Sequence, residues 1–179
     1  ALLPPLRGPS DTARRKITSI LQKAIDGKIT VQKEEFFLRN KQGNLEFTLL
    51  AEGFRKLGLL WTLVQNGTLL NGSVLFWDEP EANLNPKLIK TLIEVLIELQ
   101  RMGVQVFIST HNYVVLKWFD LLTRDSDEIK YYSLFRDKEF NVNVKSADLF
   151  SDITPNSIDD AFEDIIGQEI ISEMGDLGK

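Results

Sequence analysis

Two adjacent acids at the end of an apolar run constrain the fold of this chain more than any other feature. Four apolar residues, 74–77, directly precede Asp78 and Glu79. An unbroken apolar run of this length predicts a strand that is buried on both faces, as in a parallel sheet. Carboxylates at the C-terminal end of such a strand lie where open α/β sheets bind their ligands. We therefore expect a ligand site at Asp78 and Glu79.

The composition predicts a globular domain that can bury a core, because 43% of the 179 residues are hydrophobic and 26% are charged. No apolar run approaches the ~20 residues that a membrane span needs, so we expect no membrane association. The absence of cysteine excludes disulfides and thiolate metal sites and favours a reducing, cytoplasmic setting. A single histidine, His111, also excludes a metal site built from several histidines.

The charge is divided unevenly along the chain. Residues 148–179 contain nine acids and one base, whereas the other residues contain 17 acids and 20 bases. The net charge of −5 therefore comes from an acidic tail on a mildly basic body. This balance argues against a broad nucleic-acid surface and leaves room for a local one.

The hydrophobic periodicity predicts alternating helices and strands. We expect an α/β fold, with a mainly parallel sheet flanked by helices and small antiparallel additions. Three segments follow from this pattern: a linker, helix and antiparallel strands in 1–50, a core lobe in 51–147, and an acidic helix in 148–179 whose apolar side docks on the domain. The expected helices cover residues 12–25, 54–65, 86–102, 113–122 and 157–174, and the expected strands cover 29–32, 36–39, 45–50, 74–77, 104–108, 129–136 and 140–145.

Four short segments carry a family resemblance. They are Leu50-Ala51-Glu52-Gly53-Phe54-Arg55-Lys56, Phe76-Trp77-Asp78-Glu79-Pro80-Glu81, Ala82-Asn83-Leu84-Asn85-Pro86 and Phe107-Ile108-Ser109-Thr110-His111-Asn112. In this order they resemble the signature, Walker B, D-loop and switch-histidine motifs of ATP-binding-cassette (ABC) type ATPases, in the soluble, SMC-like branch of AAA-family ATPases. The resemblance implies a P-loop NTPase fold of the ABC type, in its C-terminal lobe.

The resemblance also implies an ATPase that uses ATP and Mg²⁺. Asp78 would hold the metal, through a water because Mg²⁺ sheds its hydration shell reluctantly. Glu79 would orient or deprotonate the attacking water, and His111 would sense the γ-phosphate. The remaining cofactor-binding positions implied by the family are Ala51, Glu52, Gly53 and Asn85.

The signature segment departs from the transporter pattern Leu-Ser-Gly-Gly-Gln. Ala51 replaces the serine and Glu52 replaces a glycine. In the family this helix end faces ATP held by the opposite subunit of a head-to-tail homodimer, so we expect Gly53 to permit close backbone approach. Glu52 would repel ATP unless its carboxylate points away or forms an ion pair, for which Arg55 is the expected partner.

A phosphate-cradling G-x-x-x-x-G-K-[ST] loop is missing from the sequence. Position 1 is Ala and the first methionine is Met102, so we interpret the chain as a fragment whose P-loop comes from an upstream segment. This chain alone would then be inactive. The alternative is a nucleotide-independent interaction module that assembles with a nuclease or another partner, including DNA, in DNA repair or defence. The adjacent Asp78 and Glu79 favour the enzyme.

Overall fold

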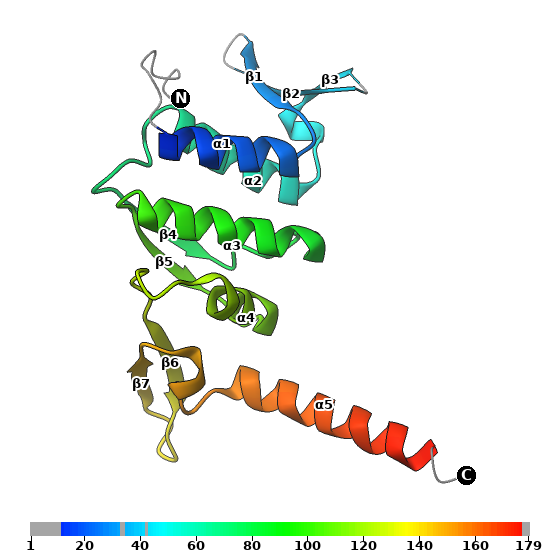
Figure 1. Ribbon diagram of the computed structural model, residues 1–179, viewed down its shortest axis with the longest axis vertical. Helices are drawn as coiled ribbons and strands as arrows, with labels where there is room; N and C mark the ends of the chain where they lie inside the picture. The colour runs from blue at the N-terminus through cyan, green and yellow to red at the C-terminus, as the bar shows by residue number, and fades with distance from the viewer. Residues whose placement is uncertain (1–11, 33–34, 42, 177–179) are drawn as a thin grey trace. The chain divides into compact units, whose positions relative to one another are not determined.

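A computed structural model of the chain describes residues 12–32, 35–41 and 43–176 (Figure 1). Its elements form two compact units. Unit 1 contains the described residues up to Thr110 together with Arg124–Asp127, and unit 2 contains His111–Thr123 and the described residues from Glu128 onward. Within these residues, no helix has the combination of length and apolar character that crossing a membrane requires.

Three helices form the core of unit 1: α1 (Thr12–Ala24), α2 (Glu52–Gln65) and α3 (Pro86–Arg101). The predicted start of α3 is confirmed, because the Asn85 side chain accepts a hydrogen bond from the Lys87 N–H at 3.0 Å and Pro86 opens the helix. α1 packs on both α2 and α3 (Figure 1). Apolar residues that recur at helical spacing form the buried core, including Ile17, Leu21, Leu57, Val64, Leu92, Ile93, Leu96 and Leu99.

Unit 1 also contains two small sheets. β1 (Lys28–Gln32), β2 (Glu35–Asn40) and β3 (Gly43–Glu46) pair antiparallel. β4 (Val74–Asp78) and β5 (Gln105–Ser109) pair parallel, with Asp78 opposite Ser109. α3 connects β4 to β5.

The prediction of a mainly parallel sheet is wrong for the described residues. Parallel pairing is confined to β4 and β5, and the other strand pairs are antiparallel. The connections explain this result. Only two residues separate β1 from β2 and β2 from β3, a spacing that permits only antiparallel pairing, whereas the helical crossover α3 permits parallel pairing.

β4 was expected to be buried on both faces, and this prediction is also wrong. Its exposure alternates along the strand: the side chains of Val74 and Phe76 are 48% and 76% exposed. Phe107 of β5 is 43% exposed, and its ring stacks on Phe76 with centroids 4.8 Å apart. α3 contacts the β5 region, but the face that carries these three side chains remains open to solvent.

The strand predicted over 45–50 ends early. β3 stops at Glu46, and Phe47–Leu49 form a short 3₁₀ turn, η1. The Thr48 hydroxyl donates a hydrogen bond to Glu46 Oε1 at 2.6 Å. Local bonds of this kind compete with strand pairing, which the apolar alternation alone does not reveal.

Unit 2 is built from α4 (Tyr113–Leu122), the hairpin of β6 (Tyr131–Arg136) and β7 (Val142–Ala147), the 3₁₀ turn η2 (Phe150–Asp152), and α5 (Ser157–Asp176). Aromatic rings join these elements. Tyr113 stacks on Phe162 of α5 with centroids 3.8 Å apart, and Phe150 lies 5.8 Å from the Tyr131 ring. Burial raises the pKa of Tyr131 to about 12. The predicted hairpin and helices are confirmed.

The expectation that the apolar side of α5 docks on the domain is only partly correct. Phe162 packs against α4, but most side chains beyond it on the helix are exposed. Ile165 and Ile170 are 61% and 52% exposed. The sequence pattern showed an apolar side correctly, but periodicity does not state whether a neighbouring element lies within reach of it.

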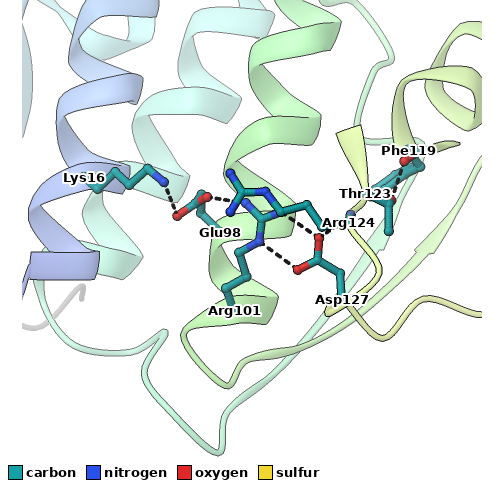
Figure 2. Close-up of polar contacts among 7 residues, drawn as sticks. All are labelled: Lys16, Glu98, Arg101, Phe119, Thr123, Arg124 and Asp127. Carbon is teal, nitrogen blue, oxygen red and sulfur yellow. Dashed lines mark hydrogen bonds and ion pairs between the residues drawn. The ribbon is translucent and has the colours of Figure 1, made fainter. Parts of the chain in front are cut away.

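A cluster of ion pairs joins three parts of unit 1 (Figure 2). Lys16 of α1 contacts Glu98 of α3 at 2.8 Å, and Arg101 contacts Glu98 at 2.6 Å. Arg101 also donates two hydrogen bonds to Asp127, at 2.8 and 2.6 Å. The Asp127 side chain is 2% exposed, and the Arg101 bonds hold the pKa of Asp127 below its usual value of 3.8.

We predict that Asp127→Asn lowers the free energy of unfolding at pH 7 by about 1.5–3 kcal/mol, the usual range for hydrogen bonds to charged groups. Because the folded state lowers the Asp127 pKa, its contribution is complete above pH 3.8 and disappears as the pH falls through the folded-state value. The difference between the two proteins should therefore shrink in acid. Urea unfolding followed by tryptophan fluorescence from neutral to acidic pH measures it.

Asp125→Asn is the matched control, since Asp125 lies in the same turn but is exposed. It should change the free energy of unfolding by no more than about 0.5 kcal/mol. Equal effects of the two substitutions would contradict a special role for the Arg101–Asp127 pair.

Candidate functional site

The predicted acid pair lies at the C-terminal tip of β4. Asp78 is the last residue of the strand, opposite Ser109 at the end of β5. Glu79 turns the chain with a positive φ of 43°, and its N–H donates a hydrogen bond to the Ser109 carbonyl at 2.9 Å. The parallel pairing therefore brings both acids to the edge of the sheet where open α/β folds bind ligands.

The Asp78 carboxylate accepts a hydrogen bond from the Ser109 hydroxyl, so two oxygen-bearing side chains meet at this edge. Residues 12–32, 35–41 and 43–176 contain no group of three or more His, Cys, Asp or Glu side chains that could hold a metal ion. A complete protein-made cage is thus lacking there. The Asp78 carboxylate is a ligand of the kind that Mg²⁺ accepts, since this ion keeps several waters and is usually held by one or two carboxylates together with substrate phosphates.

The residues after Asp78 form a compact turn, which we call the acidic loop (residues 79–84). Internal hydrogen bonds run from the Ala82 N–H to the Glu79 carbonyl at 3.0 Å and from the Leu84 N–H to the Glu81 carbonyl at 2.9 Å. Asn83 has a positive φ of 60°. The loop leads directly into the Asn85 cap of α3. Asn85, predicted as a cofactor-binding residue, thus serves as a helix cap.

The N-terminal part of α2 contacts the acidic loop through two side chains. Lys56 Nζ donates to the Ala82 carbonyl at 2.7 Å and to the Glu79 carbonyl at 3.3 Å. Glu52 Oε2 accepts a hydrogen bond from Asn83 Nδ2 at 2.8 Å. The Glu52 carboxylate is therefore hydrogen-bonded to the acidic loop. The partner in this bond is Asn83, whereas the sequence suggested Arg55.

Gly53 is buried where α2 crosses the acidic loop. A Cβ at this position would lie 2.9 Å from the Asn83 carbonyl oxygen and 3.0 Å from Leu84 Cδ1. The sequence suggested that Gly53 makes room for a ligand, and the structure gives a second physical reason, the close packing of α2 on the loop. Ala51 is the exposed N-cap residue of α2 and makes no side-chain capping bond, as expected after loss of the serine hydroxyl.

His111 lies two residues after the end of β5 and is the first residue of unit 2. Asn112 follows it and caps α4, accepting a hydrogen bond from the Val114 N–H at 2.9 Å. Within unit 1 the structure brings together Asp78, Glu79, Glu52 and Gly53. His111 belongs to the other unit, and its part in the site stays a prediction.

The sequence did not single out Glu81 or Lys56 as a site residue. Glu81 is only 7% exposed, and its carboxylate accepts a hydrogen bond from the hydroxyl of Thr110, the residue before His111. Its second oxygen, Oε2, has no hydrogen-bond partner within the described part of the chain. The available signal was a third acid close to the end of an apolar strand. Lys56 carried no comparable signal, because a lysine on a helix is usually solvated.

Residues 6–117 match the family described as "AAA domain, putative AbiEii toxin, Type IV TA system". The match covers more than half of the chain, including α2, β4, the acidic loop, α3 and β5. The chain belongs to this AAA-domain family. A comparison with curated proteins finds no match.

Three solved structures share the fold of this AAA-domain chain. One, from work on ATP-driven dimerization and DNA-stimulated activation of SMC ATPases, has a TM-score of 0.56 and 15% identity and covers 76% of this chain and 84% of its own. The SmcHead bound to the C-winged helix domain of ScpA has a TM-score of 0.58 and 15% identity, over 79% of this chain and 44% of its own.

The third structure is an Smc head domain with an extended coiled coil, bound to the C-terminal domain of ScpA, from Pyrococcus furiosus. Its TM-score is 0.55 at 14% identity, over 88% of this chain and 37% of its own. The AAA-domain chain thus spans less than half of two of these three chains. By family and by fold it is an ATPase-like α/β domain.

Gly53→Ala tests the packing of α2 on the acidic loop. We predict a loss of about 1–3 kcal/mol in the free energy of unfolding, as for other overpacked sites, because the new Cβ meets the loop backbone. Gly167→Ala is the matched control, since a Cβ at Gly167 of α5 has nothing within 4 Å. It should be neutral or stabilise the protein by up to about 1 kcal/mol. Chemical unfolding measures both, and equal behaviour would contradict the packing.

Proposed function

We propose that this chain is the part of a Mg²⁺-dependent ATPase that hydrolyses ATP at the tip of β4. The observation that carries the proposal is the placement of Asp78 and Glu79 side by side at the C-terminal end of a parallel strand, on a turn held by Lys56 and Ser109. Membership of the AAA-domain family supports the same reaction class.

The two acids would have separate tasks. Asp78, hydrogen-bonded to Ser109, would hold Mg²⁺ through its water shell, and the bound metal would neutralise phosphate charge. Glu79 would orient or deprotonate the water that attacks the γ-phosphate. The Glu79 N–H donates a hydrogen bond to the Ser109 carbonyl, and the Glu79 carbonyl accepts one from Lys56. These two bonds hold the backbone from which the carboxylate extends.

His111, which follows β5, would contact the γ-phosphate and report its presence. Thr110, the preceding residue, is hydrogen-bonded to buried Glu81 of the acidic loop. The end of β5 is therefore tied to the same loop that begins with Glu79. This link supports a common response of the acid and the histidine to nucleotide.

We also propose that two copies form a head-to-tail dimer in which the N-terminus of α2 faces ATP bound by the partner copy. α2 is 14 residues long, so its N-terminal N–H groups and dipole favour an anion. The Glu52 carboxylate accepts a hydrogen bond from Asn83 of its own chain, which holds it on the acidic loop. Ala51, Gly53 and Asn85 would complete this surface. An SMC ATPase of the same fold is described as dimerizing with ATP.

The phosphate-binding loop would come from a segment outside this sequence. The solvent-open face of β4 and β5 supports this proposal, because Phe76 is 76% exposed and stacks on Phe107. Adjacent exposed aromatic side chains on a sheet commonly mark a surface that another element covers. A segment that carries the P-loop and covers this face would complete both the sheet layer and the nucleotide site.

The second candidate is a nucleotide-independent interaction module that assembles with a nuclease or another partner in DNA repair or defence. The same open face of β4 and β5 favours it, since a partner protein could cover Phe76 and Phe107 equally well. The two proposals differ in what Asp78 and Glu79 do: the module needs neither carboxylate.

In the protein that includes the P-loop segment, we predict that Glu79→Gln preserves ATP binding and lowers turnover by about 10²–10⁴-fold, the usual loss on removing a general base. Glu128→Gln, at an exposed acid of unit 2, is the control and should leave turnover unchanged. Steady-state ATPase assays and nucleotide binding measure the two properties. Unchanged turnover in Glu79→Gln would favour the interaction module.

For the chain alone we predict no tight ATP site, because backbone N–H groups and the lysine of a P-loop dominate affinity for the phosphates. Calorimetric titration with Mg-ATP should give no saturable binding. Tight binding by this chain would mean that its phosphate site lies elsewhere in the residues described above.

A further inference from the structure

α5 carries an apolar stripe that nothing in the described chain covers. Ile166, Ile170 and Met174 recur every four residues, so they lie on one side of the helix. Their side chains are 43%, 52% and 68% exposed. The start of α5 is fixed by the stacking of Phe162 on Tyr113, and the stripe begins on the next turn.

The β6–β7 hairpin of the same unit carries a second uncovered apolar surface. One face packs on its own unit: the Ser133 hydroxyl donates to the Pro155 carbonyl at 2.5 Å, and Tyr131 lies against Phe150. The opposite face pairs Leu134 with Val144 across the two strands. We call this opposite face the hairpin face, and its apolar members, with their exposed fractions, are Tyr132 59%, Leu134 70%, Val142 63% and Val144 58%.

The charges of the two surfaces are complementary. α5 contains seven acids and no base. Residues 129–147 contain four bases and two acids, but Lys130 pairs with Asp148 and Lys145 lies over Phe135 on the packed face, so Arg136 is the base of the hairpin face. One of these acids, Asp137, is engaged by the turn between the strands, where it accepts bonds from the N–H groups of Glu139 and Asn141 at 2.9 Å. Arg136 is exposed and stands opposite Val142 at the end of the hairpin face.

We propose that the apolar stripe of α5 in one copy of the chain lies on the hairpin face of a second copy. The dimensions agree, since the 14 residues from Glu163 to the end of α5 span about 20 Å and the six-residue strands span a similar length, about 20 Å. The contact would bury two apolar surfaces that are now solvated.

Charge determines which pairing forms. Two α5 helices laid side by side would bring together 14 acids with no base between them, so helix–helix association is disfavoured. The helix on the hairpin instead places Glu169 and Glu173, which flank the stripe, on a face whose strand residues include one base, Arg136, and no acid. Because each copy carries both surfaces, reciprocal exchange closes a two-fold dimer with two identical contacts. This dimer needs no nucleotide and is independent of the ATPase proposal.

Cysteine cross-linking tests the contact directly, because the chain contains no cysteine of its own. A tagged copy with Ile170→Cys and an untagged copy with Leu134→Cys are mixed without nucleotide and oxidised. We expect a disulfide-linked pair of one tagged and one untagged chain. The control replaces Ile170→Cys by Gln168→Cys, which is exposed and lies nearly opposite the stripe, and should give only background cross-linking.

A solution measurement completes the test. Sedimentation of the unmodified chain without nucleotide should show a concentration-dependent dimer. Ile170→Asp should weaken dimerisation by on the order of tenfold or more, whereas Gln168→Asp, with the same added charge, should not. Both positions are exposed, so neither change disturbs the core.

The proposal would be overturned by a monomer at every concentration, by equal cross-linking at the two helix positions, or by a chain carrying both Ile170→Cys and Leu134→Cys that links only within itself. The last result would show that α5 folds onto its own hairpin. A dimer that Ile170→Asp leaves intact would also overturn it, because another surface would then hold the copies together.

Discussion

The parallel pairing of β4 with β5 positions the acid pair Asp78 and Glu79. α3 connects the two strands, and its buried side chains fix the crossover against α1. The register then sets Asp78 opposite Ser109. Glu79 takes a left-handed backbone conformation that costs about 1–3 kcal/mol for a residue other than glycine, so it needs support from its surroundings. Its N–H and carbonyl both have that support, from Ser109 and Lys56.

α2 links the signature segment to the acidic loop as one piece. Glu52 and Lys56 bond to the loop, and the absence of a Cβ at Gly53 lets the helix backbone approach Asn83. A displacement of the loop would therefore require a displacement of the α2 N-terminus. In the dimer that we propose, the α2 surface that would meet the partner and Glu79, the proposed base, would therefore move together.

Much of the fold could be predicted from sequence, because the decisive signals were local. Asn85-Pro86 marked the start of α3, and apolar periodicity located the five α-helices of the described residues. Exposure could not be predicted: the run 74–77 reads as fully buried, yet Phe76 is open to solvent because no described element covers that face. The acid pair was found from its position after a strand. The contacts of Lys56 and Glu81 depend on residues distant in sequence, so no local pattern revealed them.

The open face that contains Phe76 and Phe107 also bears on the colloidal behaviour of the chain. Its net charge of −5 opposes aggregation, but residues 148–179 supply that sign, while the remaining residues, which include the aromatic face, carry a small positive charge. Repulsion between molecules thus originates mainly in the tail. At about 0.1 M salt, charges farther apart than roughly 10 Å are largely screened. The solubility of the isolated chain should therefore depend on the ionic strength of the solution as well as on its sequence.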